Sequence, residues 1–249
     1  MIGIRIASVF AVVVVWYLLT RDQTATEALL FPSPVVSLQK FLSHHELFIS
    51  YTLSTWQRVI VGCLIGAVSG IGIGFSVHRF KVLEAIVDPL IEIIRPVPPI
   101  ALTPFFILWF GLGNLGQYLI VALGCFMVVF VGVVVSVRNV APVYIKAARS
   151  LGAGDGKLYL HVLLPAVVPS LLASLRVSAA TGFGLTVAAE YLGAQGGLGF
   201  LIRNARTTLD TDTILVAVVL LGAVALMTDL ILRLTFRAFT DWQPRQATV

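Results

Sequence analysis

Three of the charged side chains in or beside long apolar runs are candidates for a polar route, because a charge there is costly unless it faces protein or water. They are Arg95, Arg176 and Glu190. A fixed positive charge beside a polar route would offset part of the cost of moving an anion through a medium of low dielectric constant. We therefore predict that at least one of the two arginines faces such a route, with Glu190 nearer its outer end. The alternatives are a structural ion pair or strut and, for Arg95, a local pair with Glu92.

The other reactive side chains do not form a catalytic or metal-binding set. No nucleophile lies near a general base in any apolar run, and the histidines are scattered outside the centres of the runs, with His44 and His45 as the one adjacent pair. Cys63 and Cys125 both fall in apolar runs and predict neither a disulfide framework nor a metal site. The stretch GAGDGK lacks the flanking glycine and hydroxyl residue of a phosphate-binding loop. We expect no catalytic residue, cofactor or metal in this chain.

The composition indicates that lipid surrounds most of the chain. Of its 249 residues, 58% are hydrophobic and 12% are charged, whereas a soluble domain carries about 25% charged residues. We expect an all-α, polytopic membrane protein with about six spans in a single transmembrane domain over residues 1–249. The basic residues gather at the ends of apolar runs and not in a stripe that would bind nucleic acid. The expected spans are residues 2–19, 59–77, 82–110, 117–137, 163–189 and 213–232.

The first apolar run has a second interpretation, as a secretory signal. No small-residue cleavage site follows it, so we predict a retained helix over residues 2–19. Residues 20–57 are predicted to form a polar, proline-containing segment with some amphipathic character.

A stripe of glycines marks the second span. They recur every four residues, so they share one helix face, and small residues let helices approach closely in lipid. We predict packing within the subunit, with a contact between subunits as the alternative. The glycines are Gly62, Gly66, Gly70 and Gly74.

The third span, residues 82–110, is predicted to be broken. Its prolines remove backbone donors and interrupt helical bonding, and such breaks are tolerated at membrane depth where they are buried in protein or line a cavity. Pro98 and Pro99 therefore join Arg95 as candidates for a pathway. In the preceding helix, Glu84, Asp88 and Glu92 are spaced by four and share one face.

The distribution of Lys and Arg predicts that both termini lie in the cytoplasm. With the N-terminus inside, ten basic residues fall on the inner side and five on the outer side. The inner set is Arg5, Arg79, Lys81, Arg138, Lys146, Arg149, Lys157, Arg233, Arg237 and Arg245. The outer set is Arg21, Lys40, Arg58, Arg203 and Arg206.

Two polar segments separate the later spans. Residues 142–157 are placed in the cytoplasm, where they predict a short exposed helix from Pro142 to Leu151 that glycines end. Such a helix suits a groove on a partner protein. On the outer side, the loop 194–212 is glycine-rich and then amphipathic. Its glycines Gly196, Gly197 and Gly199 are candidates for an external gate or docking surface, with a plain re-entrant connector as the alternative.

The cytoplasmic segment resembles the EAA loop of binding-protein-dependent ABC importer permeases. That pattern is Glu-Ala-Ala, three residues, Gly, nine residues and Ile-x-Leu-Pro. Here it is Lys146-Ala147-Ala148, Gly152 and then Val162-Leu163-Leu164-Pro165, with the same spacing throughout. Lys146 stands in place of the family's Glu, which puts in doubt any ion pair made by that Glu but not the helix itself.

The resemblance extends over residues 55–240. The stretches DPLIEIIRPVPPIALTPFFILWFGLG and VAAEYLGAQGGLGFLI resemble the nitrate, sulfonate and taurine branch, and taurine permeases most closely. It implies a type I importer permease fold, in which residues 142–157 form a coupling helix that rests in a cleft of an ATPase. The coupling residues would be Lys146, Ala147, Ala148, Gly152, Leu164 and Pro165. Pro165 is expected to stop the helical register of this segment from running unbroken into the fifth span.

The same resemblance implies the partners and the location. They are a second copy of the chain, two cytoplasmic ATPase subunits that bind ATP and Mg²⁺, and an external binding protein, at the inner membrane of a bacterium. The solute would be taurine or another aliphatic sulfonate, with nitrate, bicarbonate and uncharged vitamin precursors as further candidates. The alternatives from other classes are a self-sufficient secondary carrier or channel, which often shows repeated halves, and a membrane enzyme.

Overall fold

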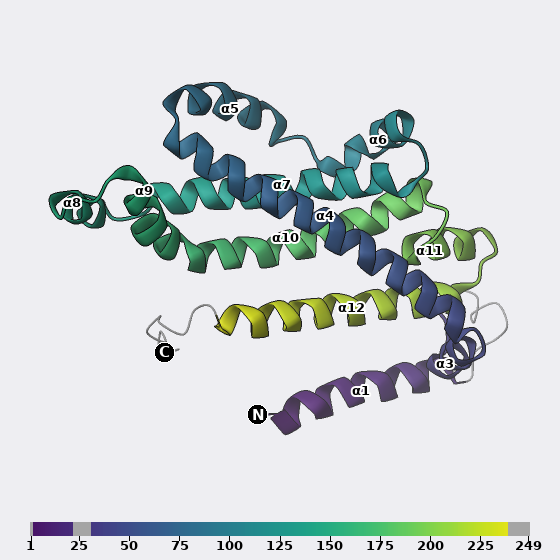
Figure 1. The fold of residues 1–249 in the computed structure, drawn as a ribbon. Coiled ribbons are helices and arrows are strands. Elements are labelled where there is room, and N and C mark those ends of the chain that lie inside the picture. The colour runs from purple at the N-terminus through teal and green to yellow at the C-terminus, as the bar shows by residue number, and fades with distance from the viewer. Residues whose placement is uncertain (1, 22–30, 239–249) are drawn as a thin grey trace. The chain divides into compact units, whose positions relative to one another are not determined.

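The computed structural model describes residues 2–21 and 31–238, without the side chains of residues 2–6, 9, 10, 237 and 238. All regular structure in this part of the chain is helical (Figure 1), which confirms the expected all-α class. In chain order the elements are α1 (Ile2–Thr20), α3 (Pro34–Ser43), α4 (His45–Arg79), α5 (Lys81–Ile94), the 3₁₀ turn η1 (Pro99–Leu102), α6 (Thr103–Phe110), α7 (Asn114–Arg138), α8 (Pro142–Ser150), α9 (Asp155–Leu158), the π-helical turn η2 (Tyr159–Leu163), α10 (Leu164–Gly193), α11 (Leu198–Thr207) and α12 (Thr211–Ala238).

Four continuous helices are long and apolar enough to cross a membrane. They are α4, α7, the run Asp155–Gly193 and the apolar part of α12. A fifth candidate is the pair formed by α5 and the η1–α6 segment, which meet at an angle of 86° across the proline cluster. The first expected span, residues 2–19, coincides with α1, in which Ala11–Thr20 is the described apolar stretch.

Helix α4 begins much earlier than expected. The expected second span, residues 59–77, lies within α4, and residues 45–57 of the segment expected to be polar and partly amphipathic form the N-terminal part of the same helix. Phe48 explains the extension, since it is 1% exposed and packs with Leu198, Leu201 and Ala217. This burial depends on residues far along the chain, so the local polarity of the segment does not indicate it.

The helix continues through Pro165, but its α-helical register is broken just before this residue, in keeping with the expected change of register. Residues 155–193 form one continuous run in which η2 precedes Leu164. In this turn the amide of Leu164 donates to the carbonyl of Tyr159, five residues back. Proline lacks a donor and its ring clashes with the carbonyl four residues earlier, so the wider π turn accommodates Pro165 without ending the helix. A second proline, Pro169, lies inside α10.

The described chain forms two compact units, and α4, α10 and α12 contribute to both. The first unit comprises Met1–Gln57 and Val187–Val224. Lys40 of α3 lies 2.9 Å from Asp210, which also accepts hydrogen bonds from Thr213 at the start of α12. Partial burial would raise the pKa of Asp210, but its bonds with Lys40 and Thr213 outweigh that effect and hold the pKa below its ordinary value.

The second unit comprises Arg58–Thr186 and Ala225–Val249, and it includes α7, along which many residues are buried. One face of α7 packs on η2 and α10 through a buried apolar cluster. A neighbouring face packs on α4 and α5 through a second cluster. The buried members of these clusters are Val129, Val133, Val137, Leu163, Val167 and Leu171 in the first and Val77, Phe130 and Val134 in the second.

The glycine stripe of α4 contacts α7, which confirms the predicted packing within the subunit. A Cβ atom on Gly66 would lie 2.5 Å from the carbonyl oxygen of Ala122 and 2.8 Å from the amide nitrogen of Phe126. Glycines 62, 70 and 74 also have α7 atoms within 3.1 Å of a built Cβ. Only glycine allows this approach along the full stripe.

Candidate functional site

Helix α8 begins with Pro142 and ends at a glycine, as the sequence predicts. Gly152 has φ +78°, a left-handed conformation that favours glycine. Its amide donates to the carbonyl of Arg149, and the amide of Ala153 donates to the carbonyl of Ala148, both at 3.0 Å. These two bonds form a Schellman motif, which satisfies carbonyls at the end of the helix and turns the chain sharply.

One face of α8 is held by the protein and another is open. Ile145 packs against the cluster formed by α7, η2 and α10. Tyr144, Ala147 and Leu151 recur at spacings of three and four, so they share a face, and the side chains of Tyr144 and Leu151 are 62% and 87% exposed. Lys146 is exposed beside them. This exposed surface is apolar at its centre.

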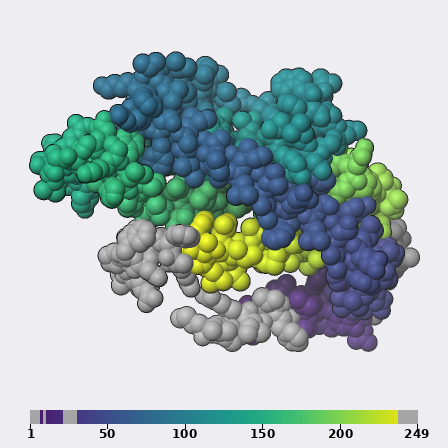
Figure 2. Space-filling view, in the orientation of Figure 1, coloured from purple at the N-terminus to yellow at the C-terminus, as the bar shows by residue number. Residues whose placement is uncertain are grey.

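The turn after α8 sits at one end of the second unit. Figure 1 shows α8 beyond the ends of α7 and α10, and Figure 2 shows the green segment as a protruding lobe. Leu164 and Pro165 are exposed on the helix that returns from this lobe. The residues of the sequence pattern therefore belong to one projecting segment, of which Ala148 is half-buried and Gly152 is exposed.

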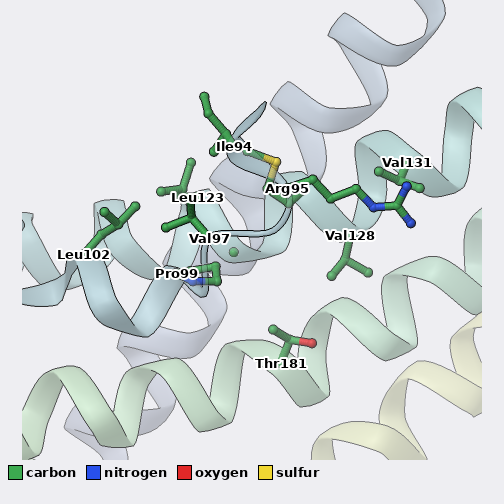
Figure 3. A pocket seen from close by; sticks show the side chains of 11 residues that line it. Ile94, Arg95, Val97, Pro99, Leu102, Leu123, Val128, Val131 and Thr181 are labelled. Carbon is green, nitrogen blue, oxygen red and sulfur yellow. The ribbon is translucent and has the colours of Figure 1, made fainter. Parts of the chain in front are cut away.

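A cavity of about 380 Å³ lies in the second unit beside the proline break. Arg95 is the one charged residue among those that line it, and Thr181 of α10 adds a hydroxyl group. Figure 3 shows the Arg95 side chain extending past Val128 toward Val131. The remaining lining residues are Ile94, Val97, Pro99, Leu102, Leu123, Gly124, Met127, Val128 and Val131.

The proline break explains why Arg95 is available. The amide of Arg95 makes the last bond of α5, to the carbonyl of Ile91 at 2.8 Å. Pro96 and Pro98 follow and cannot donate, so the helix ends and η1 starts at Pro99. Arg95 is exposed, and no ion pair joins it to Glu92 or to another described residue. Of the two proline candidates, Pro99 lines the cavity and Pro98 does not.

Arg176 is held differently. Its guanidinium lies 2.9 Å from a carboxylate oxygen of Asp229 on α12, and Asp229 also pairs with Arg233 at 2.7 Å. Arg176 does not line the cavity beside Arg95. The pair favours the structural alternative for Arg176, and its assignment to a pathway stays a prediction.

Glu190 is completely buried in the first unit. Its carboxylate accepts hydrogen bonds from the hydroxyl of Thr55 at 2.9 and 3.0 Å and from the amide of Gly199 at 2.8 Å. Thr55 in turn accepts a bond from the amide of Leu198 at 2.8 Å. Glu190 and Thr55 thus cap the N-terminus of α11, where free amides and the helix dipole favour a negative group. This geometry matches the structural strut that was the alternative prediction for Glu190, and its assignment to a pathway stays a prediction.

The glycine loop is shaped by this carboxylate. Gly197 has φ +103°, and a Cβ atom there would overlap the carboxylate of Glu190. At Gly199 a Cβ atom would lie 2.5 Å from the carbonyl oxygen of Val187. A Cβ atom on Gly196 would meet only ordinary van der Waals contact, with the ring of Tyr51 at 3.7 Å. Two of the three glycines are therefore required by packing on Glu190, and a role in gating or docking stays a prediction.

Several contacts were not predicted. Arg138 at the end of α7 pairs with Glu84 at 2.9 Å and with Asp88 at 2.8 Å, and the acidic spacing on α5 was the available signal. Arg58 is 7% exposed and donates to Asn114 at 3.0 Å. No pattern in the sequence indicates that second contact.

The two cysteines lie close together, although the sequence places them in separate runs. The sulfur atoms of Cys63 and Cys125 are 3.2 Å apart and both residues are free thiols. Within the described residues, no group of three or more His, Cys, Asp or Glu side chains could hold a metal ion. The candidate functional features of the described residues are therefore the projecting helix α8 and the cavity lined by Arg95.

Comparison with known proteins gives a family match over most of the chain. Residues 62–241 match the family described as "Binding-protein-dependent transport system inner membrane component". The taurine transport system permease protein TauC of Escherichia coli (strain K12) is 31% identical over 97% of this chain and 90% of its own length. The putative aliphatic sulfonates transport permease protein SsuC of Bacillus subtilis (strain 168) is 31% identical over 87% of this chain and 79% of its own length.

Solved structures show the same fold. A chain of the MetNI methionine ABC transporter in an inward-facing conformation superposes with a TM-score of 0.63 at 20% identity, covering 77% of this chain and 97% of that one. A chain of an amino acid ABC transporter gives a TM-score of 0.62 at 17% identity, covering 82% of this chain and 98% of that one. These matches support the expected type I importer permease fold.

Proposed function

The chain belongs to the family of inner membrane components of binding-protein-dependent transport systems, and from this premise we propose that it translocates a small sulfonate, either taurine or another aliphatic sulfonate. As a member of this family it is a multi-pass permease subunit of an ABC importer and not an ATPase. Membership also implies ATPase and binding-protein partners, so the chain is not a self-sufficient carrier or channel. The proposal adds the solute, the route and the assembly.

Two kinds of observation support a sulfonate. The relatives named above are permeases for taurine and for aliphatic sulfonates. The cavity of the second unit has a single cation, Arg95, in an otherwise apolar lining with one hydroxyl. A guanidinium binds oxyanions well because its planar donors match their geometry. One such group lowers the cost of entry, and the apolar remainder keeps binding weak enough for release.

The assembly follows from the projecting segment. We assign α8 as the coupling helix, with its exposed face around Ala147 in a groove of the ATPase and with Lys146, Ala148 and Gly152 shaping the contact. Leu164 and Pro165 begin the helix that returns to the membrane. Each chain has one α8, so two copies would serve two ATPase subunits, with both termini in the cytoplasm. In this scheme the loop with Gly196, Gly197 and Gly199 forms an external gate or a docking surface for the binding protein.

The observation that carries the proposal is the position of Arg95 in the cavity, and a pair of variants tests it. In proteoliposomes that contain the whole complex, Arg95→Gln should lower taurine uptake by about tenfold or more, since a hydrogen bond to a charged group contributes about 1.5–3 kcal/mol. Basal ATPase activity should stay within about twofold of the wild type. The matched variant Arg176→Gln removes a guanidinium from the Asp229 pair and should mainly lower thermal stability.

Two results would contradict this proposal. One is normal uptake by Arg95→Gln together with a strong loss in Arg176→Gln, which would move the route to the other arginine. The second concerns the solute and is measured on the purified binding protein by calorimetry. Taurine or an alkanesulfonate should bind, whereas binding of nitrate or bicarbonate alone would assign the complex to another anion.

A further inference from the structure

One carboxylate joins three elements at the end of the second unit. Asp155 is the first residue of α9, directly after the turn that follows α8. One of its oxygens lies 2.9 Å from the guanidinium of Arg79, the last residue of α4. Its other oxygen lies 3.8 Å from the guanidinium of Arg149 on α8. Asp155 therefore connects the projecting helix to α4, which is not adjacent to it along the chain.

Aromatic side chains hold the same guanidinium. Arg79 lies 5.9 Å from the ring centre of Tyr159 and 5.7 Å from that of Phe80, within the range of cation–π contacts. The ring of His78 lies 6.3 Å from that of Tyr159. Tyr159 also packs against the buried cluster of α7 and α10. The end of α4 is thus attached to the segment that follows α8 by an ion pair and by ring contacts.

This ion pair contributes little to the free energy of folding, but it is one of the few contacts that fix the position of α8. The Arg79 and Asp155 side chains are 45% and 50% exposed, and an isolated pair at such a site contributes little to stability. Helix α8 has no fully buried residue, so few contacts fix its position. The π turn η2 lies next to Asp155, and such turns often mark functional sites. A displacement of α8 therefore meets little resistance except through the contacts of Ile145 and Asp155.

We propose that Asp155 is a positioning residue that transmits displacement of α8 to α4 through Arg79. The covalent connections of α8 lead only to α7 and α10, so this ion pair supplies a separate route into the membrane part of the unit. The proposal rests on the assignment of α8 as the coupling helix. Its consequence is that loss of the pair lowers the amount of solute moved per ATP without releasing the ATPase.

The test measures solute uptake and ATP hydrolysis in the same proteoliposomes containing the complete complex. Asp155→Asn and Arg79→Gln should each lower uptake per ATP about fivefold, the lower end of typical coupling between sites. In a background with Arg149→Gln, which removes the second cation beside position 155, the double variant Arg79→Asp with Asp155→Arg restores the opposite charges and should recover most of the ratio. The control Lys40→Asp disrupts an ion pair of equal length, 2.9 Å, in the other unit and should leave the ratio unchanged.

A pull-down of the ATPase separates the possible failures. Retained ATPase with a lowered ratio, rescued by the double variant, supports the transmitting role. Loss of the ATPase from Asp155→Asn would overturn the transmitting role and would indicate a docking contact instead. A normal ratio of uptake to ATP hydrolysis in both single variants would also overturn it, and so would a double variant whose ratio is as low as those of the single variants. If the wild-type chain retained no ATPase in the pull-down, the result would contradict the proposed function and not only the role of Asp155.

Discussion

Gly152 has the strictest backbone requirement in the projecting segment. Its φ of +78° is needed for the two bonds that end α8, yet a Cβ atom there would meet nothing within 4 Å. The requirement is therefore conformational and not steric. The neighbouring Gly156 also has open space around it, but its φ is outside the left-handed range. These two glycines allow conformation and packing to be separated.

We predict that Gly152→Val lowers solute uptake about tenfold while the subunit still inserts in the membrane. A β-branched residue in the left-handed region costs about 1–3 kcal/mol, which displaces α8 from its resting position. The measurement is uptake normalised to the amount of subunit in the membrane fraction. Gly156→Val is the control and should transport within about twofold of the wild type. Equal uptake by both variants would show that the left-handed turn is unnecessary.

At the scale of residues, features that depend on nearby sequence were predictable, whereas contacts between residues far apart in the sequence were not. The glycine after α8 was predictable because a helix end needs a left-handed residue close by in the sequence. Thr55 could not be linked to Glu190 because 135 residues separate them and both lie in segments without a motif. The same holds for Arg176: its place in an apolar run is unusual, but nothing local identifies Asp229, 53 residues away, as its partner.

At the scale of elements, the contact between α4 and α7 sets the strictest packing limit. The four glycines of the stripe are buried, whereas Gly72 on the same helix is exposed and has no atom within 4 Å of a built Cβ. The two kinds of position differ only in what they face. A substitution series along α4 can therefore measure this contact directly.

We expect Gly66→Val to destabilise the subunit by about 1–3 kcal/mol or to prevent its accumulation, since the atoms it would meet belong to the backbone of α7. Gly72→Val should change stability by less than about 0.5 kcal/mol. Both are measured by thermal unfolding of the purified subunit in detergent, with the amount in membranes as a second readout. A stable Gly66→Val variant would mean that the two helices separate more easily than their contact indicates.

The boundaries of the helices show why some elements were predictable. Apolar runs and proline clusters are local properties, so α7, α12 and the bend between α5 and α6 occur where these patterns are. The N-terminal part of α4 is held by distant apolar residues, and its sequence is too polar to predict a span. The continuous helix through Pro165 required knowledge of a π turn, which has no clear sequence pattern.

At the scale of the whole molecule, the number of projecting segments predicts the assembly. Each chain has one α8, and a pair of ATPase subunits that bind ATP between them would present two equivalent grooves. We therefore predict two copies of this chain for two ATPase subunits, related by a two-fold axis. Native mass spectrometry of the purified complex measures the ratio. A complex with one copy of this chain per pair of ATPases would contradict the prediction.

The π turn η2 has a consequence for rotational phase. Leu158 and Leu163 are both buried although they are five residues apart, and on a regular α-helix such residues point about 140° away from each other. After the turn, Leu163, Val167 and Leu171 follow at the usual spacing of four. The extra residue thus brings the buried stripe of α10 into line with Leu158. The fixed interval between Gly152 and Pro165 therefore specifies an angle as well as a length. Removing one residue from it would rotate the segment around Asp155 by about 100° relative to α10, even if every side chain that remained were unchanged.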